Sequence, residues 1–189
     1  MVLGERKATR KARSGALFYG LVVLLFVSTL AWMIVEYVAA RPPYVGGNAP
    51  EFELPLLNRA SERLALSSLR GRPLLINFWS VTCPPCLEEL PDMVDVYERY
   101  ASRGFELVAI NTDFDPQLEP LAHEYLAARS FPFPVAFDVH GDVALRYHVT
   151  TIPHSVFVGA DGIVRKLVRR RMAYEELMAE VEALFGPPG

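Results

Sequence analysis

Residues 79–91 have the sequence WSVTCPPCLEELP and contain both cysteines of the chain, Cys83 and Cys86. A disulfide that closes so short a loop removes little conformational entropy from the unfolded chain. A chain of 189 residues can also bury a core large enough to fold without a disulfide staple. We therefore interpret the pair as a redox or metal-binding site and not as a structural crosslink.

The flanking sequence places the pair between a strand and a helix. Residues 74–79, LLINFW, form an apolar run broken only by Asn77, which is typical of a strand buried on both faces. Apolar residues then recur at helical spacing: Leu87, Leu90, Val94 and Tyr97. Cys83 is therefore expected at a helix N-terminus, where free N–H groups and the helix dipole stabilise a thiolate. Pro91 is expected to kink this helix.

The spacing of the two cysteines predicts their roles. Cys83 precedes the first helical turn and is expected to be the exposed attacking thiol, whereas Cys86 lies one turn inside and would resolve the mixed disulfide. Pro84 and Pro85 lack N–H groups, so donors to a Cys83 thiolate come only from Cys86 onward. Because no histidine separates the cysteines, we expect a modestly lowered pKa for Cys83 and a redox couple nearer the reducing end.

The remaining chain alternates between strand and helix patterns, which predicts an α/β domain. Strands are expected over 105–111, 135–137, 156–158 and 163–168, with a turn at 159–162. Helices are expected over 115–130, with Pro116 in the first turn, and over 142–147 and 174–185. A weak N-terminal hairpin is expected from segments 52–54 and 63–66.

The N-terminal segment predicts export. Residues 14–35 carry no charge, and a basic tail with a net charge of +4, residues 1–13, precedes them. We predict a cytoplasmic tail (1–13), a transmembrane helix or uncleaved signal anchor (14–37), a linker (38–48) and an extracytoplasmic domain (49–186). A cleaved signal sequence ending near Val38-Ala39-Ala40 is the alternative, and it also exports the domain. The residues after the tail comprise 14 basic and 21 acidic side chains, which argues against nucleic-acid binding.

Four features together resemble a known family: Asn77-Phe78-Trp79 at a strand end, Cys83-Pro84-Pro85-Cys86, a helix containing Pro91, and Thr150-Thr151-Ile152-Pro153 ahead of a hairpin. They resemble the membrane-anchored, thioredoxin-like thiol-disulfide oxidoreductases of the TlpA and ResA type, which are related to the cytochrome c maturation reductants. The resemblance covers about residues 49–185. It implies a thioredoxin-like fold, with a central mixed sheet flanked by helices, extended by the N-terminal β-hairpin.

The resemblance also implies roles for individual residues. The Ile152–Pro153 peptide bond would be cis and face the disulfide, with the Ile152 backbone pairing a client strand. Trp79, Pro84 and Pro85 would complete the substrate-contacting surface. Glu89 would be an acid that tunes the cysteines and moves protons near Cys86, although a solvated helix glutamate is the other interpretation.

Two positions depart from the family pattern. Thr82 stands where an aromatic residue commonly precedes the first cysteine, which removes a surface that shields the thiol or holds a partner. Asn77 stands where thioredoxin has a buried acid on the central strand, and an amide cannot accept a proton in the same way. Glu89 or water would have to fill that role.

Three other functions could use a similar cysteine pair. A peroxidase of the peroxiredoxin kind requires Pro and Thr at the positions held by Ile76 and Ser80, so that interpretation fails. Copper delivery would use Cys83 and Cys86 with His148 or His154 as a third ligand. A thiol oxidase or isomerase on the same fold is the third.

The preferred interpretation is a membrane-tethered reductant. It would reduce disulfides in exported client proteins such as apocytochrome c, and a membrane-embedded thiol electron donor would regenerate it. The domain would lie on the periplasmic side of a bacterial cytoplasmic membrane, with the N-terminus in the cytoplasm. The reaction needs no organic cofactor and no metal, because the redox group is the Cys83–Cys86 disulfide.

Overall fold

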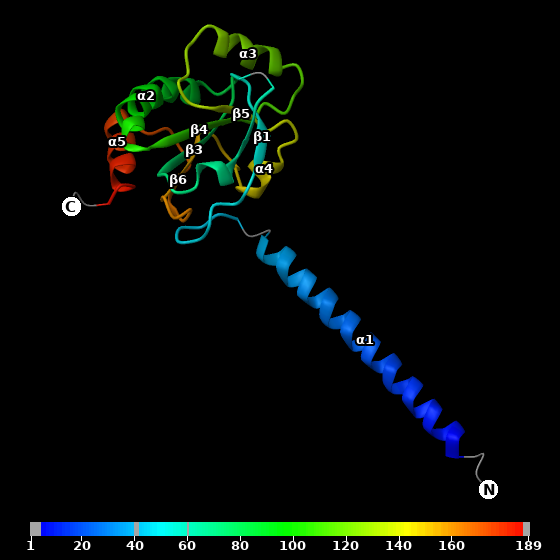
Figure 1. Cartoon of the computed structure of the whole chain (residues 1–189). Coiled ribbons are helices and arrows are strands. Elements are labelled where there is room, and N and C mark those ends of the chain that lie inside the picture. The colour runs from blue at the N-terminus through cyan, green and yellow to red at the C-terminus, as the bar shows by residue number, and fades with distance from the viewer. Residues whose placement is uncertain (1–4, 40–41, 60, 187–189) are drawn as a thin grey trace. The chain divides into compact units, whose positions relative to one another are not determined.

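The computed structural model describes residues 5–39, 42–59 and 61–186, and the chain divides into two units, Met1–Arg41 and Pro42–Gly189. The described part of the first unit is helix α1 (Glu5–Ala39), and the second unit is an α/β domain (Figure 1). Within α1, Phe18–Tyr37 is long and apolar enough to cross a membrane. Residues 1–4 of the expected tail and Ala40 of the alternative cleavage site lie outside the described residues.

The described part of the domain contains a five-stranded mixed sheet in the order β5-β4-β3-β6-β7. Its strands are β3 (Leu74–Trp79), β4 (Glu106–Asn111), β5 (Val135–Phe137), β6 (His154–Val158) and β7 (Val164–Val168). Strands β3, β4 and β5 run parallel, whereas β6 is antiparallel to β3 and β7. All six residues of β3 are buried, as the apolar run predicts for the middle of the sheet. This arrangement confirms the thioredoxin-like fold.

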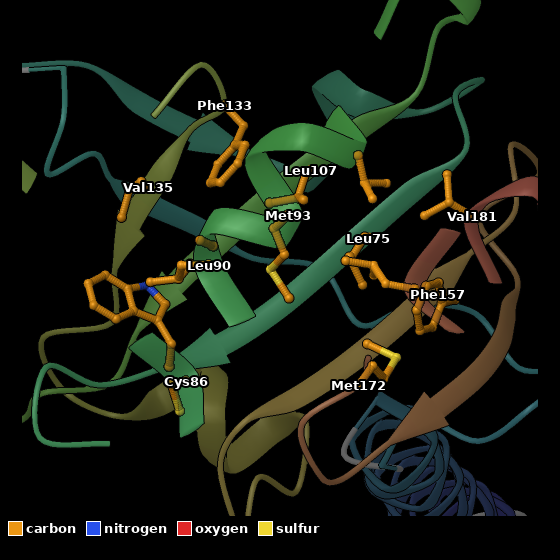
Figure 2. Close-up of a cluster of buried hydrophobic side chains, with 14 of the residues drawn as sticks. Leu75, Cys86, Leu90, Met93, Leu107, Phe133, Val135, Phe157, Met172 and Val181 are labelled. Carbon is orange, nitrogen blue, oxygen red and sulfur yellow. The ribbon is translucent and has the colours of Figure 1, made fainter. Parts of the chain in front are cut away.

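The two faces of the sheet carry different elements. Helices α2 (Pro84–Tyr100) and α5 (Tyr174–Ala183) pack against one face around Leu75 and Phe157, and Figure 2 shows Cys86, Leu90 and Met93 of α2 in the same core. Part of α3 (Glu119–Ala127) joins this core. The opposite face is covered by the predicted hairpin, β1 (Glu53–Pro55) and β2 (Arg63–Ala65), by the 3₁₀ helix η1 (Leu66–Leu69), and by α4 (Asp142–Arg146). A second 3₁₀ helix, η2 (Ala101–Arg103), follows α2.

Helix α3 begins later than the sequence predicts. Residues 115–118 form a local turn instead, in which the Asp115 side chain accepts a hydrogen bond from the Gln117 N–H at 2.9 Å and the Asp115 carbonyl accepts one from Leu118. An Asp side chain competes with helix formation in this way. The proline in the first turn of α3 is therefore Pro120, and the prediction for Pro116 is wrong.

Two other expectations concern prolines and the linker. Helix α2 continues through Pro91 to Tyr100, and the expected kink stays a prediction. The last part of the predicted linker is attached to the domain, because the Gly46 N–H donates to the Val164 carbonyl at 2.8 Å and Asn48 pairs with Ile163. These contacts lie at the start of β7, the end of the sheet opposite the turn that leads from Trp79 to Cys83.

Candidate active site

The two cysteines lie where the sequence predicts, at the carboxyl end of the central strand. The turn from Ser80 to Thr82 connects β3 to α2, and Cys83 precedes the first residue of the helix. A disulfide joins Cys83 to Cys86, with 5.3 Å between the Cα atoms. Cys83 is 8% exposed and Cys86 is 1% exposed, so both are buried in the disulfide form and the expectation of an exposed Cys83 is wrong. Cys83 is the less enclosed of the two residues, which makes it the one that an incoming sulfur can reach more readily.

The helix N-terminus offers Cys83 one nearby backbone donor. Cys83 is the N-cap of α2, and its Sγ accepts a hydrogen bond from the Cys86 N–H at 3.3 Å. Pro84 and Pro85 occupy the first two positions of the helix and have no N–H to add. In the reduced protein the Cys83 thiolate would occupy the position of this sulfur. The Cys86 N–H and the helix dipole would then favour the ionised form of Cys83.

The Ile152–Pro153 peptide bond is cis, as the resemblance implies. In the register of β3 and β6, Phe78 pairs with His154. Pro153, which directly precedes β6, therefore lies beside the carboxyl end of β3. Pro153 is buried, and Ile152 is half-buried and packs against the core that contains both cysteines. The pairing of β3 with β6 thus brings this peptide and the cysteine pair to the same end of the sheet.

Glu89 is a buried acid and not a solvated one. It is 0% exposed, one turn after Cys86 on α2, and its Oε1 accepts a hydrogen bond from the Met172 N–H at 3.0 Å. Its Oε2 has no hydrogen-bond partner among the described residues. Burial raises the pKa of Glu89 from 4.5 to about 7, although the Met172 N–H, the positive charge of Arg171 and the Asn77 amide oppose this rise. A carboxyl group that titrates near neutral pH can both take and give a proton.

Asn77, which the resemblance matches to the central-strand acid of thioredoxin, lies on β3. It is 1% exposed and its Nδ2 donates to the Ser155 Oγ at 3.0 Å, across β3 and β6. An amide in this position is a hydrogen-bonding group and not a proton acceptor. Glu89 is therefore the titratable acid that the structure encloses beside the central strand.

Trp79 does not lie on the surface. Its side chain is 0% exposed and its indole packs against the Tyr125 ring with 5.7 Å between centroids. The Trp79 side chain therefore packs inside the domain and has no exposed surface that a client could contact. Pro84 and Pro85, in contrast, are exposed. Direct contact of Trp79 with a substrate, which the resemblance implies, disagrees with this burial.

A shallow groove of about 350 Å³ lies directly beside Thr82. Its lining comes from the turn before Cys83 and from α3 and the residues after it: Val81, Thr82, Leu121, Glu124, Tyr125, Ala128 and Arg129. The Arg129 guanidinium lies 4.1 Å from the centre of the Tyr125 ring, at the edge of this groove. A small residue at position 82 leaves this groove open beside the attacking cysteine.

The residues proposed for copper binding do not converge. His154 is 0% exposed and packs edge-on against Phe78, with ring centroids 5.9 Å apart. Phe78 belongs to the core on the face opposite to the one that contains the cysteines. Within the described ranges, no three His, Cys, Asp or Glu side chains are grouped so that they could hold a metal ion.

The sequence interpretation missed Asp113. This residue is 2% exposed, two positions after β4, and it accepts hydrogen bonds from Ser80 and Val81 in the turn before Cys83. A signal was available, because loops at the carboxyl ends of neighbouring parallel strands meet at one edge of a sheet, which is where such folds form their sites. An acid directly after the strand next to β3 was therefore a candidate.

Comparison with known proteins agrees with this geometry. The AhpC/TSA family model matches residues 45–167. The thiol-disulfide oxidoreductase ResA of Bacillus subtilis is 30% identical over 168 residues, which cover 88% of this chain and 90% of that protein. ResA of Oceanobacillus iheyensis is 27% identical over 89% of this chain and 88% of its own length. A crystal structure of a thiol:disulfide interchange protein, DsbE, from Chlorobium tepidum has a TM-score of 0.70 and 29% identity, and the match covers 76% of this chain and 99% of that one. The chain belongs to the AhpC/TSA family, and within it to the ResA-like thiol-disulfide oxidoreductases.

Proposed function

We propose that this protein reduces disulfides in exported client proteins, with Cys83 as the nucleophile and Cys86 as the resolving thiol. The observation that carries the proposal is the unequal environment of the two sulfurs. Cys83 is the more accessible sulfur and caps the N-terminus of α2, whereas Cys86 is enclosed within the same turn. This arrangement allows a client sulfur to reach Cys83, and it keeps Cys86 within reach of the resulting mixed disulfide.

The reaction proceeds by two thiolate attacks. The Cys83 thiolate attacks one sulfur of the client disulfide, which forms a mixed disulfide and releases the other client sulfur as a thiolate. The Cys86 thiolate then attacks the Cys83 sulfur, which releases the second client thiolate and forms the Cys83–Cys86 disulfide. Two electrons pass from the protein to the client. A thiol donor embedded in the membrane returns two electrons to the protein by the same exchange.

Glu89 is proposed to handle the proton of the resolving thiol. Cys86 must lose its proton before it attacks, and Glu89 follows it by three positions on the same helix, which places the two on neighbouring faces. With a pKa of about 7, the Glu89 carboxyl group is partly ionised at neutral pH and can accept that proton. Its Oε1 accepts the Met172 N–H, and the Asn77 amide lies close enough to stabilise the ionised carboxylate after it takes the proton.

The surface around Cys83 is proposed to bind the client. The Ile152 backbone would pair with an extended client segment, and the exposed rings of Pro84 and Pro85 would contact it. The groove beside Thr82 would receive a side chain of the same segment. The resemblance to cytochrome c maturation reductants makes apocytochrome c the first client to test.

The cellular location is also part of the proposal. The span Phe18–Tyr37 and the basic residues before it support a single-pass anchor with the N-terminus in the cytoplasm. The domain would then lie on the periplasmic side of a bacterial cytoplasmic membrane, next to a membrane-embedded donor. Tethering raises the effective concentration of the domain for such a partner.

Trapping the mixed disulfide tests the mechanism. The variant Cys86→Ser removes the resolving thiol, so clients should accumulate on Cys83 in cells, and mass spectrometry of the adducts identifies them. The variant Cys83→Ser should accumulate none. Equal adduct levels on both variants, or no adduct on either, would contradict the assignment of roles.

The direction of electron flow is tested by the reduction potential. We expect a value nearer to about −270 mV, as in thioredoxin, than to about −120 mV, as in a strongly oxidising catalyst. The reduced protein should also reduce insulin. A potential near the oxidising value would favour the thiol oxidase over the reductant.

A further inference from the structure

A network of hydrogen bonds connects the turn that leads to Cys83 with the end of the neighbouring strand β4. Its centre is the Asp113 carboxylate. Oδ1 accepts a hydrogen bond from the Ser80 hydroxyl, and Oδ2 accepts from the Val81 N–H at 3.0 Å and from Asn111 Nδ2 at 2.6 Å. The Asp113 N–H donates to Asn111 Oδ1 at 3.2 Å. Both carboxylate oxygens therefore bind the turn after β3 to the strand beside it.

The network continues from Ser80 to Cys83. The Ser80 carbonyl accepts a hydrogen bond from the Cys83 N–H at 3.2 Å, and the Ser80 Oγ accepts one from the Thr82 N–H at 3.0 Å. The Ser80 and Thr82 hydroxyl oxygens are 2.9 Å apart. Because the single hydroxyl proton of Ser80 goes to Asp113, the Thr82 hydroxyl is the donor in this pair. The carboxylate thus binds Ser80 and Val81 directly, and Thr82 and Cys83 are bonded in turn to Ser80.

We propose that Asp113 is a positioning residue for the attacking cysteine. This inference rests on the proposed function only in taking Cys83 as the nucleophile. The Cys83 sulfur accepts a hydrogen bond from the Cys86 N–H, and the two prolines remove the other donors of the first turn. A thiolate that depends on so few donors loses stabilisation when the turn that carries it shifts. Asp113 prevents this shift through Ser80 and Val81.

A positioning role and a charge effect predict opposite results. If Asp113 acted only as a nearby negative charge, its replacement by Asn would remove repulsion and lower the pKa of Cys83. If Asp113 holds the turn, the N–H₂ group of Asp113→Asn either faces the N–H donors of Val81 and Asn111 or faces Ser80 and forces that hydroxyl to turn toward Thr82. Both arrangements weaken the hold on the turn, so the pKa of Cys83 rises. Ser80→Ala breaks the link to the turn and leaves the carboxylate in place, so it should also raise this pKa.

The domain offers a matched control in Asp138. This residue is 1% exposed and follows a parallel strand, β5, as Asp113 follows β4. Its carboxylate accepts hydrogen bonds from the Val143 and Ala144 N–H groups, at 3.2 and 2.7 Å, and so caps α4 and does not contact the turn. Asp138→Asn should reduce stability without changing the reactivity of Cys83.

The experiment measures alkylation of reduced Cys83 by iodoacetamide against pH, in the full-length chain in detergent, with Cys86→Ser as the background. We expect Asp113→Asn and Ser80→Ala each to raise the pKa of Cys83 and to slow alkylation below that pKa by about two- to tenfold, the range that a helix N-terminus gives an anion. The effects should not add in the double variant, because both break the same link. Asp138→Asn should have the wild-type profile.

Three results would overturn the proposal: an unchanged profile in Ser80→Ala, a lowered Cys83 pKa in Asp113→Asn, or an equal shift in Asp138→Asn. Ser80→Ala deletes one hydroxyl oxygen and decides the question if Asp113→Asn fails to fold. Alkylation needs no client, so the outcome is separate from the proposed function. A chain that does not reduce insulin but shows these shifts would keep the positioning role and lose the reductase.

Discussion

The buried carboxyl group of Glu89 makes stability depend on pH in a direction opposite to that of a salt-bridged acid. Its pKa is about 7 in the folded domain and 4.5 in an unfolded chain. The Glu89 carboxyl group therefore binds a proton more tightly in the folded state than in the unfolded chain. The stabilisation is fully present below pH 4.5 and is lost as the pH rises to 7 and above. At about 1.4 kcal/mol per pH unit, the loss amounts to about 3 kcal/mol.

The substitution Glu89→Gln isolates this effect. Glutamine has the same shape, stays neutral at every pH, and keeps an oxygen to accept the Met172 N–H. At pH 8 we expect the variant to unfold at a higher urea concentration than the wild type, with a free energy of unfolding larger by about 3 kcal/mol. At pH 4.5 the two proteins should unfold at similar urea concentrations. Urea unfolding of the full-length oxidised chain in detergent, followed by the fluorescence of buried Trp79, measures the difference.

The comparison must be made between variants, because His154 has the opposite effect in nearly the same range. Burial lowers the pKa of His154 from 6.5 to about 4, so its neutral form is stabilising above pH 6.5 and this contribution is lost as the pH falls toward 4. The wild-type profile therefore shows partial cancellation. The difference between wild type and Glu89→Gln removes the His154 contribution, because both proteins contain it.

The control for Glu89 is its neighbour Glu88. Glu88 is exposed, and its nearest charged partner is Arg171 at 3.6 Å, so Glu88→Gln makes the same chemical change without neutralising a buried carboxyl group. Its unfolding profile should run parallel to that of the wild type within about 0.5 kcal/mol. A constant difference between wild type and Glu89→Gln from pH 4.5 to 8 would refute the assignment of a raised Glu89 pKa.

Three further substitutions test the core, the groove and the buried histidine. Leu75→Ala, at the second residue of β3 with 0% exposure, should lower the free energy of unfolding by about 2–5 kcal/mol, as measured by urea unfolding. Thr82→Trp should fill the groove beside Thr82 and slow the reduction of a protein client more than the reduction of a small aromatic disulfide. The control Thr82→Val keeps the groove, so it should change the reduction rates of the two substrates by the same factor. His154→Gln should lose the stabilisation that the wild type gains between pH 4 and 6.5, and a wild-type slope in this range would contradict the low His154 pKa.

Much of the fold could be predicted because its signals are local. Residues 74–79 predicted β3 to the residue, since an apolar run of this length is short for a helix and typical of a strand buried on both faces. The Gly159–Gly162 turn predicted the β6–β7 hairpin, in which the Gly159 N–H donates to the Ile163 carbonyl. The start of α3 could not be predicted, because apolar spacing does not show that Asp115 will bind its own backbone.

The site was predictable only where its residues are contiguous. The order of Cys83 and Cys86 follows from their positions before and inside one helical turn. The burial of Glu89 could not be predicted, since it results from a loop about 80 residues later, whose Met172 N–H closes over it. Asp113 joins the site through the pairing of β3 with β4, and sequence spacing alone does not show which acid will face Ser80.

The two buried acids near the cysteines differ in what surrounds their oxygens, and this difference separates their roles. Asp113 has donors on both oxygens, and its carboxylate accepts three hydrogen bonds, from Ser80, Val81 and Asn111, so moving it would break several contacts at once. Glu89 has one backbone donor, the Met172 N–H, and beside it only the Asn77 amide, so its protonation disturbs few contacts. A residue that must hold a turn needs the first environment, and one that must exchange protons needs the second. We therefore expect exchange of Glu89 and Asp113 for their amides to alter different observables: the stability profile with pH for Glu89, and the reactivity of Cys83 for Asp113.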